Sequence, residues 1–330
     1  MIVCDSEFVK EISDITGTDN ILCNESMKTH TTLRIGGNAD YFVMPRTKEE
    51  LRDVIGCAKK HGIDYYILGN GSNLLVTDAG YRGMMIYTGR YFDEISYDTA
   101  YAVGNANEVN IVDTACNTGT DECVVVYAQS GVRLSRLGNS LMEEACTGFE
   151  FAAGIPGTVG GAVVMNAGAY GGEIKDVIVA AEVLADDGSI ITLSGDELGL
   201  GYRTSIIASK GYVVLGAWFR LHKGDREQIK QRMKELAALR KEKQPLEYPS
   251  AGSTFKRPEG YYAGKLISDA GLKGYHVGGA MVSEKHAGFV INTGAATASD
   301  FVALTDAVRD KVYDMYGVRL ELEVKVIGQI

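Results

Sequence analysis

The chain has 330 residues, enough for about two domains of ordinary size. Apolar residues make up 45% of it and charged residues 23%, which is the composition of an ordered globular protein and excludes a largely disordered chain. The net charge of -10 excludes the cationic surface of a general nucleic-acid-binding protein, so we expect no nucleic-acid partner.

The first clear pattern begins with a strand predicted over residues 41–44, which ends at Pro45. Thr47 and Glu50 have the spacing of a capping box at the start of a helix. Apolar residues then repeat at helical spacing as far as Gly62, which stands where a C-terminal capping glycine is expected. The region therefore predicts a strand followed by a helix.

A glycine-rich loop follows between two short apolar runs, predicted as strands over 65–68 and 74–76. A strand follows the loop and the third glycine of GxGxxG is missing, so the loop is not a Rossmann dinucleotide fingerprint, and no P-loop is present either. Successive backbone N–H groups in such a loop can converge on an anion, and a tight turn is the alternative. The loop consists of Gly69, Asn70, Gly71, Ser72 and Asn73.

The middle of the chain contains a second glycine-rich region. Residues 91–123 show little periodicity and predict a surface excursion. Residues 148–172 contain eight glycines in 25 positions, more than turns require, which indicates close backbone approach to a ligand or to a packed neighbour. Strands are predicted over 178–184, 190–193 and 212–220.

The C-terminal third begins with an amphipathic helix predicted over 226–240. Three prolines within residues 241–258 indicate a domain boundary, and a second helix is predicted over 299–316. Apolar and charged residues then alternate over 318–326, which predicts a strand buried on one face with Glu323 on the polar face.

Cysteine usage and the N-terminus bear on location. The six cysteines are scattered with no CxxC pair, so we expect reduced thiols and neither a disulfide framework nor a bound metal. The first residues show no signal-peptide pattern, and no apolar run approaches the ~18 residues of a membrane span. We therefore expect a cytoplasmic protein with no membrane partner. The cysteines are Cys4, Cys23, Cys57, Cys116, Cys123 and Cys146.

Five segments occur in an order that is typical of one protein family. They are Thr31–Ala39, Leu68–Leu74, Gly154–Ala162, Gly201–Ser205 and Ala251–Pro258. Together they resemble the UDP-N-acetylenolpyruvoylglucosamine reductase (MurB) family, and the segment Ala251–Pro258 resembles its type II members. The resemblance covers roughly residues 30–90 and 130–330.

The resemblance implies an α+β fold: a two-lobed FAD-binding module of the vanillyl-alcohol-oxidase/PCMH type, followed by a C-terminal α+β substrate-binding domain. We expect the first lobe at 1–86, the second at 87–243 and the substrate domain at 244–317. The last residues, 318–330, are expected to return to the first lobe as a strand. Ser72 stands where related oxidases carry a histidine that attaches the flavin, so FAD is expected to bind non-covalently.

The implied reaction belongs to the synthesis of peptidoglycan precursors. NADPH reduces the flavin, whose N5 then passes a hydride to UDP-N-acetylglucosamine enolpyruvate, and the product is UDP-N-acetylmuramate. The family's proton donor falls on Ser253, its catalytic arginine on Arg203 and its catalytic glutamate on Glu323. We expect a monomer with this small-molecule substrate.

The resemblance also implies the binding residues. The cofactor would be held by Gly69, Asn70, Gly71, Ser72, Asn73, Gly154, Ile155, Pro156, Gly157, Gly160, Gly161 and Ala162. Phosphate or carboxylate groups of the substrate would be held by Tyr202, Lys243, Arg257, Lys265 and His286. The tyrosine-bearing loop that closes over the substrate nucleotide in type I members is missing from the sequence.

Without the resemblance, plainer interpretations stand. Ser253 would close a turn, Arg203 would be a surface arginine, and Glu323 would be one solvated charge among several. An FAD-linked oxidase of an alcohol or hydroxy acid would have the same fold, because fold does not determine function. A non-catalytic nucleotide-sensing module is the third alternative, and it leaves the three polar residues without a role.

Overall fold

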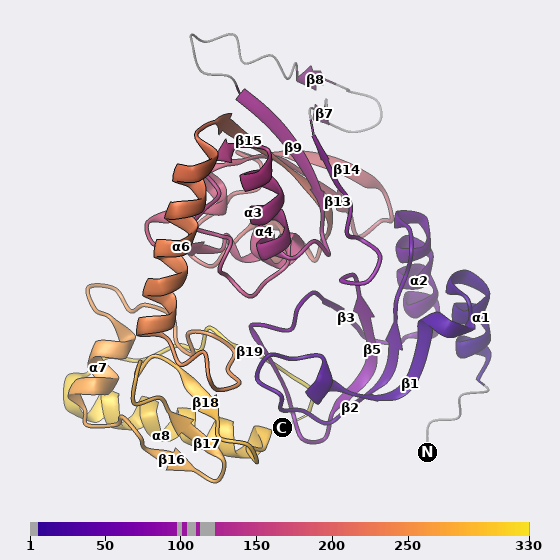
Figure 1. Cartoon of the computed structure of the whole chain (residues 1–330). Helices are drawn as coiled ribbons and strands as arrows, with labels where there is room; N and C mark the ends of the chain where they lie inside the picture. The colour runs from indigo at the N-terminus through magenta and orange to yellow at the C-terminus, as the bar shows by residue number, and fades with distance from the viewer. Residues whose placement is uncertain (1–5, 98–100, 104–109, 113–122, 330) are drawn as a thin grey trace.

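Figure 1 shows the computed structural model, which describes residues 6–97, 101–103, 110–112 and 123–329. Three groups of strands and helices surround a central region (Figure 1). Most of the excursion predicted over 91–123 lies outside the described residues. The helices are α1 (Glu7–Thr16), α2 (Lys48–His61), α3 (Leu134–Glu143), α4 (Val159–Met165), α5 (Ile206–Lys210), α6 (Arg226–Lys243), α7 (Ala263–Asp269) and α8 (Ala298–Tyr316).

The first group is a four-stranded sheet covered by α1 and α2 (Figure 1). Its strands, in spatial order, are β1 (Ile21–Ser26), β2 (Asn38–Val43), β5 (Tyr81–Tyr87) and β3 (Tyr65–Leu68). β1 is antiparallel to β2, whereas β5 is parallel to both of its neighbours. Buried side chains of α1 and α2 share a core with Leu184, Val213 and Leu215 of the second sheet, so this core joins the first two groups.

The start of α2 corrects one sequence prediction. The Thr47 side chain accepts a hydrogen bond from the Glu50 N–H, and Gly62 closes the helix in the left-handed conformation, as expected. The Glu50 carboxylate, however, accepts from the backbone N–H of Arg46 and pairs with the Arg46 guanidinium. The capping box is therefore only half formed, because the arginine offers the carboxylate a charged partner.

The second group is a six-stranded antiparallel sheet with α3, α4 and α6 on one side (Figure 1). Its strands are β14 (Ile190–Ser194), β13 (Ile178–Leu184), β15 (Val213–Lys223), β9 (Cys123–Gln129), β6 (Ile95–Tyr97) and β10 (Cys146–Thr147), the last pairing with β15. The three strands predicted over 178–184, 190–193 and 212–220 are confirmed. Sequence patterns did not identify β5, β9 or α1.

The predicted helix over 226–240 is confirmed as α6, which begins after Asp225, a residue that accepts from the Gln228 N–H. Its buried residues are Ile229, Leu236 and Arg240. Arg240 is buried because its guanidinium donates to the carbonyl oxygen of Gly154 in the second glycine-rich region. A charged residue, Arg240, is thus buried together with the apolar residues of α6.

The third group combines α7 and α8 with a three-stranded antiparallel sheet (Figure 1). The strands are β16 (His276–Val277), β17 (Ala280–Val282) and β18 (Val290–Asn292). The helix predicted over 299–316 is confirmed as α8, with a capping box between Thr297 and Asp300. The core of this group includes Leu33, Ile35 and Leu75, so the group packs directly on the first part of the chain.

The strand predicted over 318–326 is mostly absent. Only β19 (Lys325–Ile327) is a strand, and it pairs in parallel with β4 (Leu74–Val76). Leu320 and Val324 are buried all the same, because an extended segment can alternate its burial against a core without a neighbouring strand. β19 and β4 form a separate two-stranded sheet, and Ile327 of β19 packs against the core that holds Phe42 and Leu68.

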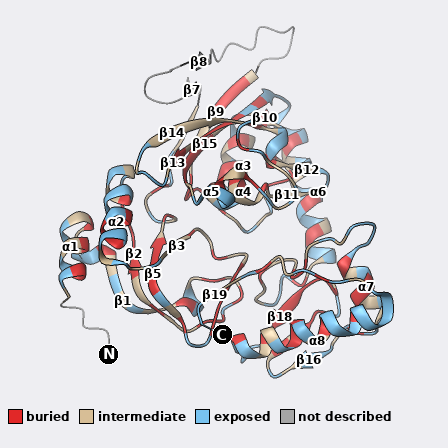
Figure 2. Ribbon diagram, turned by 180° about the vertical axis from the view of Figure 1, so that it is seen from behind, coloured by how far each residue is buried: buried red, intermediate tan, exposed pale blue. Residues whose placement is uncertain are grey.

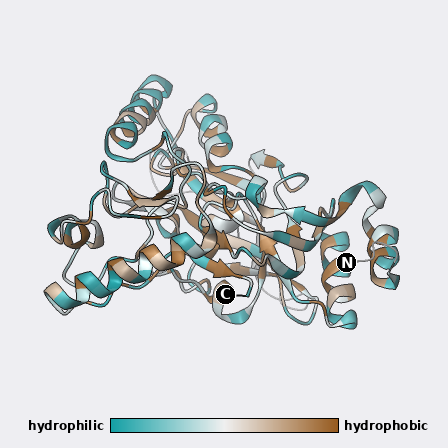
Figure 3. Cartoon of the chain, turned by 90° about the horizontal axis from the view of Figure 1, so that it is seen from below, coloured by the Kyte–Doolittle hydropathy of each residue, from teal (hydrophilic) through white to brown (hydrophobic). Residues whose placement is uncertain are grey.

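The distribution of buried residues agrees with these cores. In Figure 2, buried positions follow the strands and the sheet-facing sides of the helices, and in Figure 3 hydrophilic and hydrophobic colours alternate along the helices. Among the described residues, no helix is long and apolar enough to cross a membrane. Two short hairpins complete the strands: β7 (Tyr101–Val103) with β8 (Asn110–Val112), and β11 (Gly168–Ala169) with β12 (Gly172–Glu173).

The cysteine prediction is wrong at one position. Cys23 is in a disulfide, whereas Cys57, Cys123 and Cys146 are thiols. Two cysteines can pair only when their Cα atoms lie within about 7 Å, and scattered positions in the sequence do not report that distance.

Candidate active site

The predicted catalytic residues line one cavity of about 670 Å³, between the second and third groups. The hairpin Gly168–Glu173 and the turn with Tyr202 and Arg203 form one side, and loops around Ser253 and His286 form the other. Glu323 lines the same cavity from the C-terminal segment. This volume is ordinary for a site that holds a small organic ligand.

Backbone pairing brings Ser253 and Glu323 to this cavity. The N–H of Glu323 donates to the carbonyl oxygen of Thr254 (2.8 Å), and the N–H of Lys256 donates to that of Glu321 (2.9 Å). The C-terminal segment therefore runs beside the loop that carries Ser253. Glu323 does not lie on a solvated face, since only 11% of its side chain is exposed.

Arg203 reaches the same place from a tight turn in the second group. Its φ of 55° is left-handed, which is uncommon for a residue with a side chain and typical of functional sites. The buried side chain of Asn166 donates to the carbonyl oxygen of Gly201 (3.1 Å) and holds this turn against the end of α4. The Arg203 Nε then donates to Glu323 Oε1 at 2.5 Å.

The environment of Glu323 changes its acidity. Burial raises the pKa of this carboxyl, and the positive charges of Arg203 and Lys256 oppose the rise without cancelling it. In a buried carboxylate–arginine pair each charge depends on its partner, because removal of either one leaves an uncompensated charge in the interior. Such a pair indicates a functional site more than a stabilising contact.

Four of the five predicted substrate residues line the cavity: Tyr202, Arg257, Lys265 and His286. The backbone N–H of Arg257 donates to the Tyr202 hydroxyl (2.9 Å), which joins the two sides of the cavity. Lys243, at the C-terminal end of α6, is exposed and does not line the cavity.

His286 is held in a defined form. Its Nδ1 accepts a hydrogen bond from the N–H of Gly288 (3.1 Å), so the neutral ring carries its proton on Nε2. Burial lowers the pKa of the ring below its usual value, which favours this neutral form. His286 is therefore suited to donate a hydrogen bond from Nε2 rather than to act as a cation.

The cavity is more basic than the chain as a whole. Arg203, Arg257, Lys265 and Lys273 line it, against two acidic residues, Glu173 and Glu323. This local excess of cations favours a ligand with phosphate or carboxylate groups, despite the chain's net charge of -10. Sequence analysis did not identify Lys273, Phe255, Tyr262 or Tyr170 as lining residues; for Tyr170 the only signal was its place in the second glycine-rich region.

The two predicted cofactor loops do not line this cavity, but they lie against each other. The Asn70 side chain donates to the carbonyl oxygen of Pro156 (2.9 Å), and a Cβ at Gly69 would lie 2.4 Å from the Thr158 hydroxyl. The Asn73 side chain donates to the carbonyl oxygen of Glu323 (3.1 Å), which connects the first loop to the cavity. The cofactor loops and the catalytic residues are thus parts of one continuous site.

The first loop fits a bound diphosphate. Within the described part of the chain, none of the five backbone N–H groups from Gly69 to Asn73 donates to a protein acceptor. Five successive donors without acceptors form the kind of nest that binds anions. The residues present therefore fit the pyrophosphate of a dinucleotide such as FAD.

Substitution Gly71→Ala tests the geometry of this loop. Gly71 has φ of 59°, and a Cβ there would lie 2.1 Å from the carbonyl oxygen of His30. We expect a loss of about 1–3 kcal/mol in the free energy of unfolding, together with weaker FAD retention. Urea unfolding and the flavin content of the purified protein measure the two effects.

Gly62→Ala is the matched control. Gly62 has a similar φ of 64°, but a Cβ there would meet nothing within 4 Å. It should cost less stability and leave the flavin content unchanged. Equal effects of the two substitutions would show that the loop is not tightly packed.

Comparisons with known proteins agree with this site. The FAD-binding domain family matches residues 39–194, and the UDP-N-acetylenolpyruvoylglucosamine reductase C-terminal domain family matches residues 244–327. The chain is similar to the UDP-N-acetylenolpyruvoylglucosamine reductases of Lachnoclostridium phytofermentans (51% identity over 97% of both chains) and Agathobacter rectalis (50% over 98% of both).

A solved structure shows the same fold. The MurB enzyme of Thermus caldophilus superimposes with a TM-score of 0.72 at 34% sequence identity, covering 93% of this chain and 97% of the other. The expected fold, an FAD-binding module with a C-terminal α+β domain, is confirmed. From the two matched domains, the near-complete coverage and the cavity just described, it follows that this chain belongs to the UDP-N-acetylenolpyruvoylglucosamine reductase family.

Proposed function

We propose that the protein reduces UDP-N-acetylglucosamine enolpyruvate in this cavity, with Ser253, Arg203 and Glu323 as the catalytic residues. Membership of the family makes the chain an FAD-dependent reductase of this substrate in peptidoglycan precursor synthesis. The observation that supports the catalytic roles is the convergence of these three residues, from segments far apart in the sequence, on one cavity. An oxidase of similar fold would not need this set.

The roles follow from the charge that the reaction develops. When bound, FAD supplies a hydride to the enol ether carbon–carbon bond, and the adjacent carbon then needs a proton. We assign that proton to the Ser253 hydroxyl, which afterwards regains one from water in the open cavity. The Arg203 guanidinium stabilises negative charge on the substrate carboxylate, and Glu323 holds Arg203 in position.

We assign the binding residues as follows. The nest of Gly69–Asn73 and the facing loop of Gly154–Ala162 would hold the FAD pyrophosphate without a covalent bond. Arg257, Lys265 and Tyr202 would hold the phosphates of the substrate, and His286 would donate a hydrogen bond to it. Lys243, which does not line the cavity, is left out of this assignment.

We also propose a reductant, an oligomeric state, a location and domain bounds. NADPH is the reductant, the protein is a monomer, and the reaction takes place in the cytoplasm, where nucleotide-activated precursors are made. The domains are 1–86, 87–243 and 244–317, with 318–330 returning to the first lobe. Light scattering at several protein concentrations tests the monomer, and a mass that rises toward twice 35.6 kDa would contradict it.

An anaerobic half-reaction experiment tests the proposed function. The purified protein should be yellow, lose its colour on addition of NADPH, and regain it on addition of UDP-N-acetylglucosamine enolpyruvate. If the colour returns only with oxygen, the protein behaves as the alternative oxidase. A preparation that holds no flavin and takes up none would contradict the proposal as a whole.

A further inference from the structure

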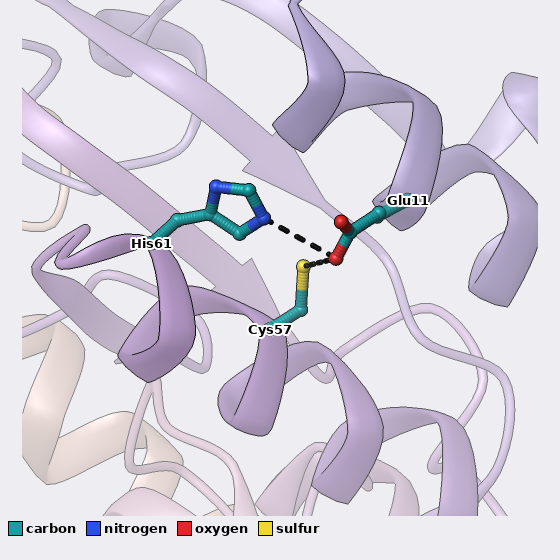
Figure 4. A group of neighbouring side chains, drawn as sticks. All are labelled: Glu11, Cys57 and His61. Atoms are coloured by element: carbon teal, nitrogen blue, oxygen red, sulfur yellow. Dashed lines mark hydrogen bonds and ion pairs between the residues drawn. The ribbon is translucent and has the colours of Figure 1, made fainter.

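A second group of chemically active side chains lies outside the cavity, where α1 packs on α2. Glu11 comes from α1, and Cys57 and His61 come from α2 (Figure 4). Cys57 and His61 are four residues apart in one helix, so their side chains share a face. Figure 4 shows the thiol and the imidazole both directed at the Glu11 carboxylate.

The distances match those of a tetrahedral metal site. Glu11 Oε2 lies 3.4 Å from Cys57 Sγ and 3.2 Å from His61 Nε2. All three atoms lie within 4.8 Å of one another. Zinc bond lengths of about 2.0–2.3 Å at tetrahedral angles place neighbouring ligand atoms about 3.3–3.5 Å apart. Two of the three separations therefore already fit, and the third, between Cys57 Sγ and His61 Nε2, is within 4.8 Å.

The ligand types also fit. A thiolate, an imidazole and a carboxylate are the groups that zinc prefers, and the two negative charges balance one divalent ion. The side chains of Glu11 and His61 are 30% and 21% exposed, so the site lies near the surface, although the His61 Nε2 atom is itself buried and makes no hydrogen bond within the described structure. The chain supplies three ligands, and the fourth position would be left to water. The apolar face of α1 adjoins the three ligands. Phe8 on that face is buried, and its ring packs edge-on against the His61 ring.

We propose that Glu11, Cys57 and His61 form a binding site for a zinc ion, which ties α1 to α2. None of the three residues lines the catalytic cavity, so the site is independent of the reaction and of the proposed function. When an ion binds, the Cys57 thiol releases its proton to solvent and the resulting thiolate coordinates the ion. One carboxylate oxygen of Glu11 coordinates it as well. The Lys60 ammonium group lies 2.8 Å from Glu11 Oε1 and 3.0 Å from Oε2, so it gives up its contact with Oε2 when the ion binds and keeps the one with Oε1.

Titration of the FAD-loaded protein with Co²⁺ tests the site. Tetrahedral Co²⁺ with a thiolate ligand absorbs at wavelengths longer than the flavin does, so its signal can be read in the holoenzyme. We expect one equivalent of bound Co²⁺, displaced by one equivalent of Zn²⁺. Zinc should also raise the temperature of unfolding, because it binds only the folded arrangement.

Two variants and a control locate the ion. Cys57→Ala and Glu11→Gln should each weaken Co²⁺ binding at least ~100-fold, more than the loss of an outer-shell partner typically costs. Cys146→Ala, which removes a buried thiol in the second group, should bind Co²⁺ as the unchanged protein does. Since Glu11 is partly exposed, Glu11→Gln should fold normally even if Cys57→Ala does not.

Lys60→Gln supplies a test in the opposite direction. It removes a positive charge beside the divalent ion, and we expect about tenfold tighter Co²⁺ binding at low salt. Absence of a tetrahedral Co²⁺ spectrum, or equal affinity in Glu11→Gln and the unchanged protein, would overturn the proposal. The three side chains would then be a hydrogen-bonded contact between two helices.

Discussion

Ser253→Ala is expected to leave the reduction of the flavin by NADPH unchanged and to slow its reoxidation by the enolpyruvyl substrate about 10²–10⁴-fold. That factor is typical for the loss of a general acid. Ser253 lines the cavity beside the C-terminal segment that carries Glu323. Stopped-flow measurement of the flavin absorbance separates the two half-reactions, since reduction by NADPH lowers the absorbance and reoxidation by the substrate restores it.

Ser209→Ala is the control for this experiment. Ser209 is an exposed serine of α5, and its hydroxyl donates to the carbonyl oxygen of Ile206. It should leave both half-reactions unchanged. Fast reoxidation in Ser253→Ala would assign the proton to another group and return Ser253 to a structural role in its loop.

Glu323→Gln is expected to slow reoxidation by about 100-fold and to leave reduction by NADPH unchanged. The substitution removes the charge that positions Arg203 through the 2.5 Å contact, so the guanidinium no longer meets the developing carboxylate charge in a fixed geometry. Glu323→Asp keeps the charge and should recover part of the rate. The same stopped-flow assay measures all three proteins.

Glu321→Gln is the matched control, because Glu321 lies two residues away on the exposed face, with 73% of its side chain exposed and paired with Lys256. It should leave the kinetics unchanged. Equal rates in Glu323→Gln and the unchanged protein would place Glu323 among the solvated charges that the alternating pattern predicts.

The raised pKa of Glu323 also predicts a pH dependence of stability. The folded protein holds the Glu323 proton more tightly than the unfolded chain does, whose carboxyl has an ordinary pKa of 4.5. The stabilisation from this group is therefore complete below pH 4.5 and lost as the pH rises through the folded-state pKa. Urea unfolding at several pH values should show this decline in the unchanged protein and in Glu321→Gln, and a flatter profile in Glu323→Gln. Parallel profiles would contradict the assignment.

The sequence alone determined the features that depend on near neighbours. The helices α2, α6 and α8 and the strands β13 and β14 follow from side-chain periodicity and from caps such as Thr47, Gly62 and Thr297. The glycine-rich loop after β3 was also recognisable, since a cluster of glycines signals a special backbone within a few residues. The order of the motifs was sufficient to identify the family and with it the cofactor.

Only the tertiary structure decided the features that depend on distant partners. Alternation placed Glu323 on a solvated face, but pairing with the Ser253 loop and with Arg203, 120 residues earlier, places it in the cavity. Arg240 is buried by a carbonyl group 86 residues away, and Cys23 is in a disulfide that its position in the sequence did not indicate. The periodicity of apolar side chains indicates which face of a segment is buried. It does not report which other segment covers that face, because that depends on the packing of the whole chain.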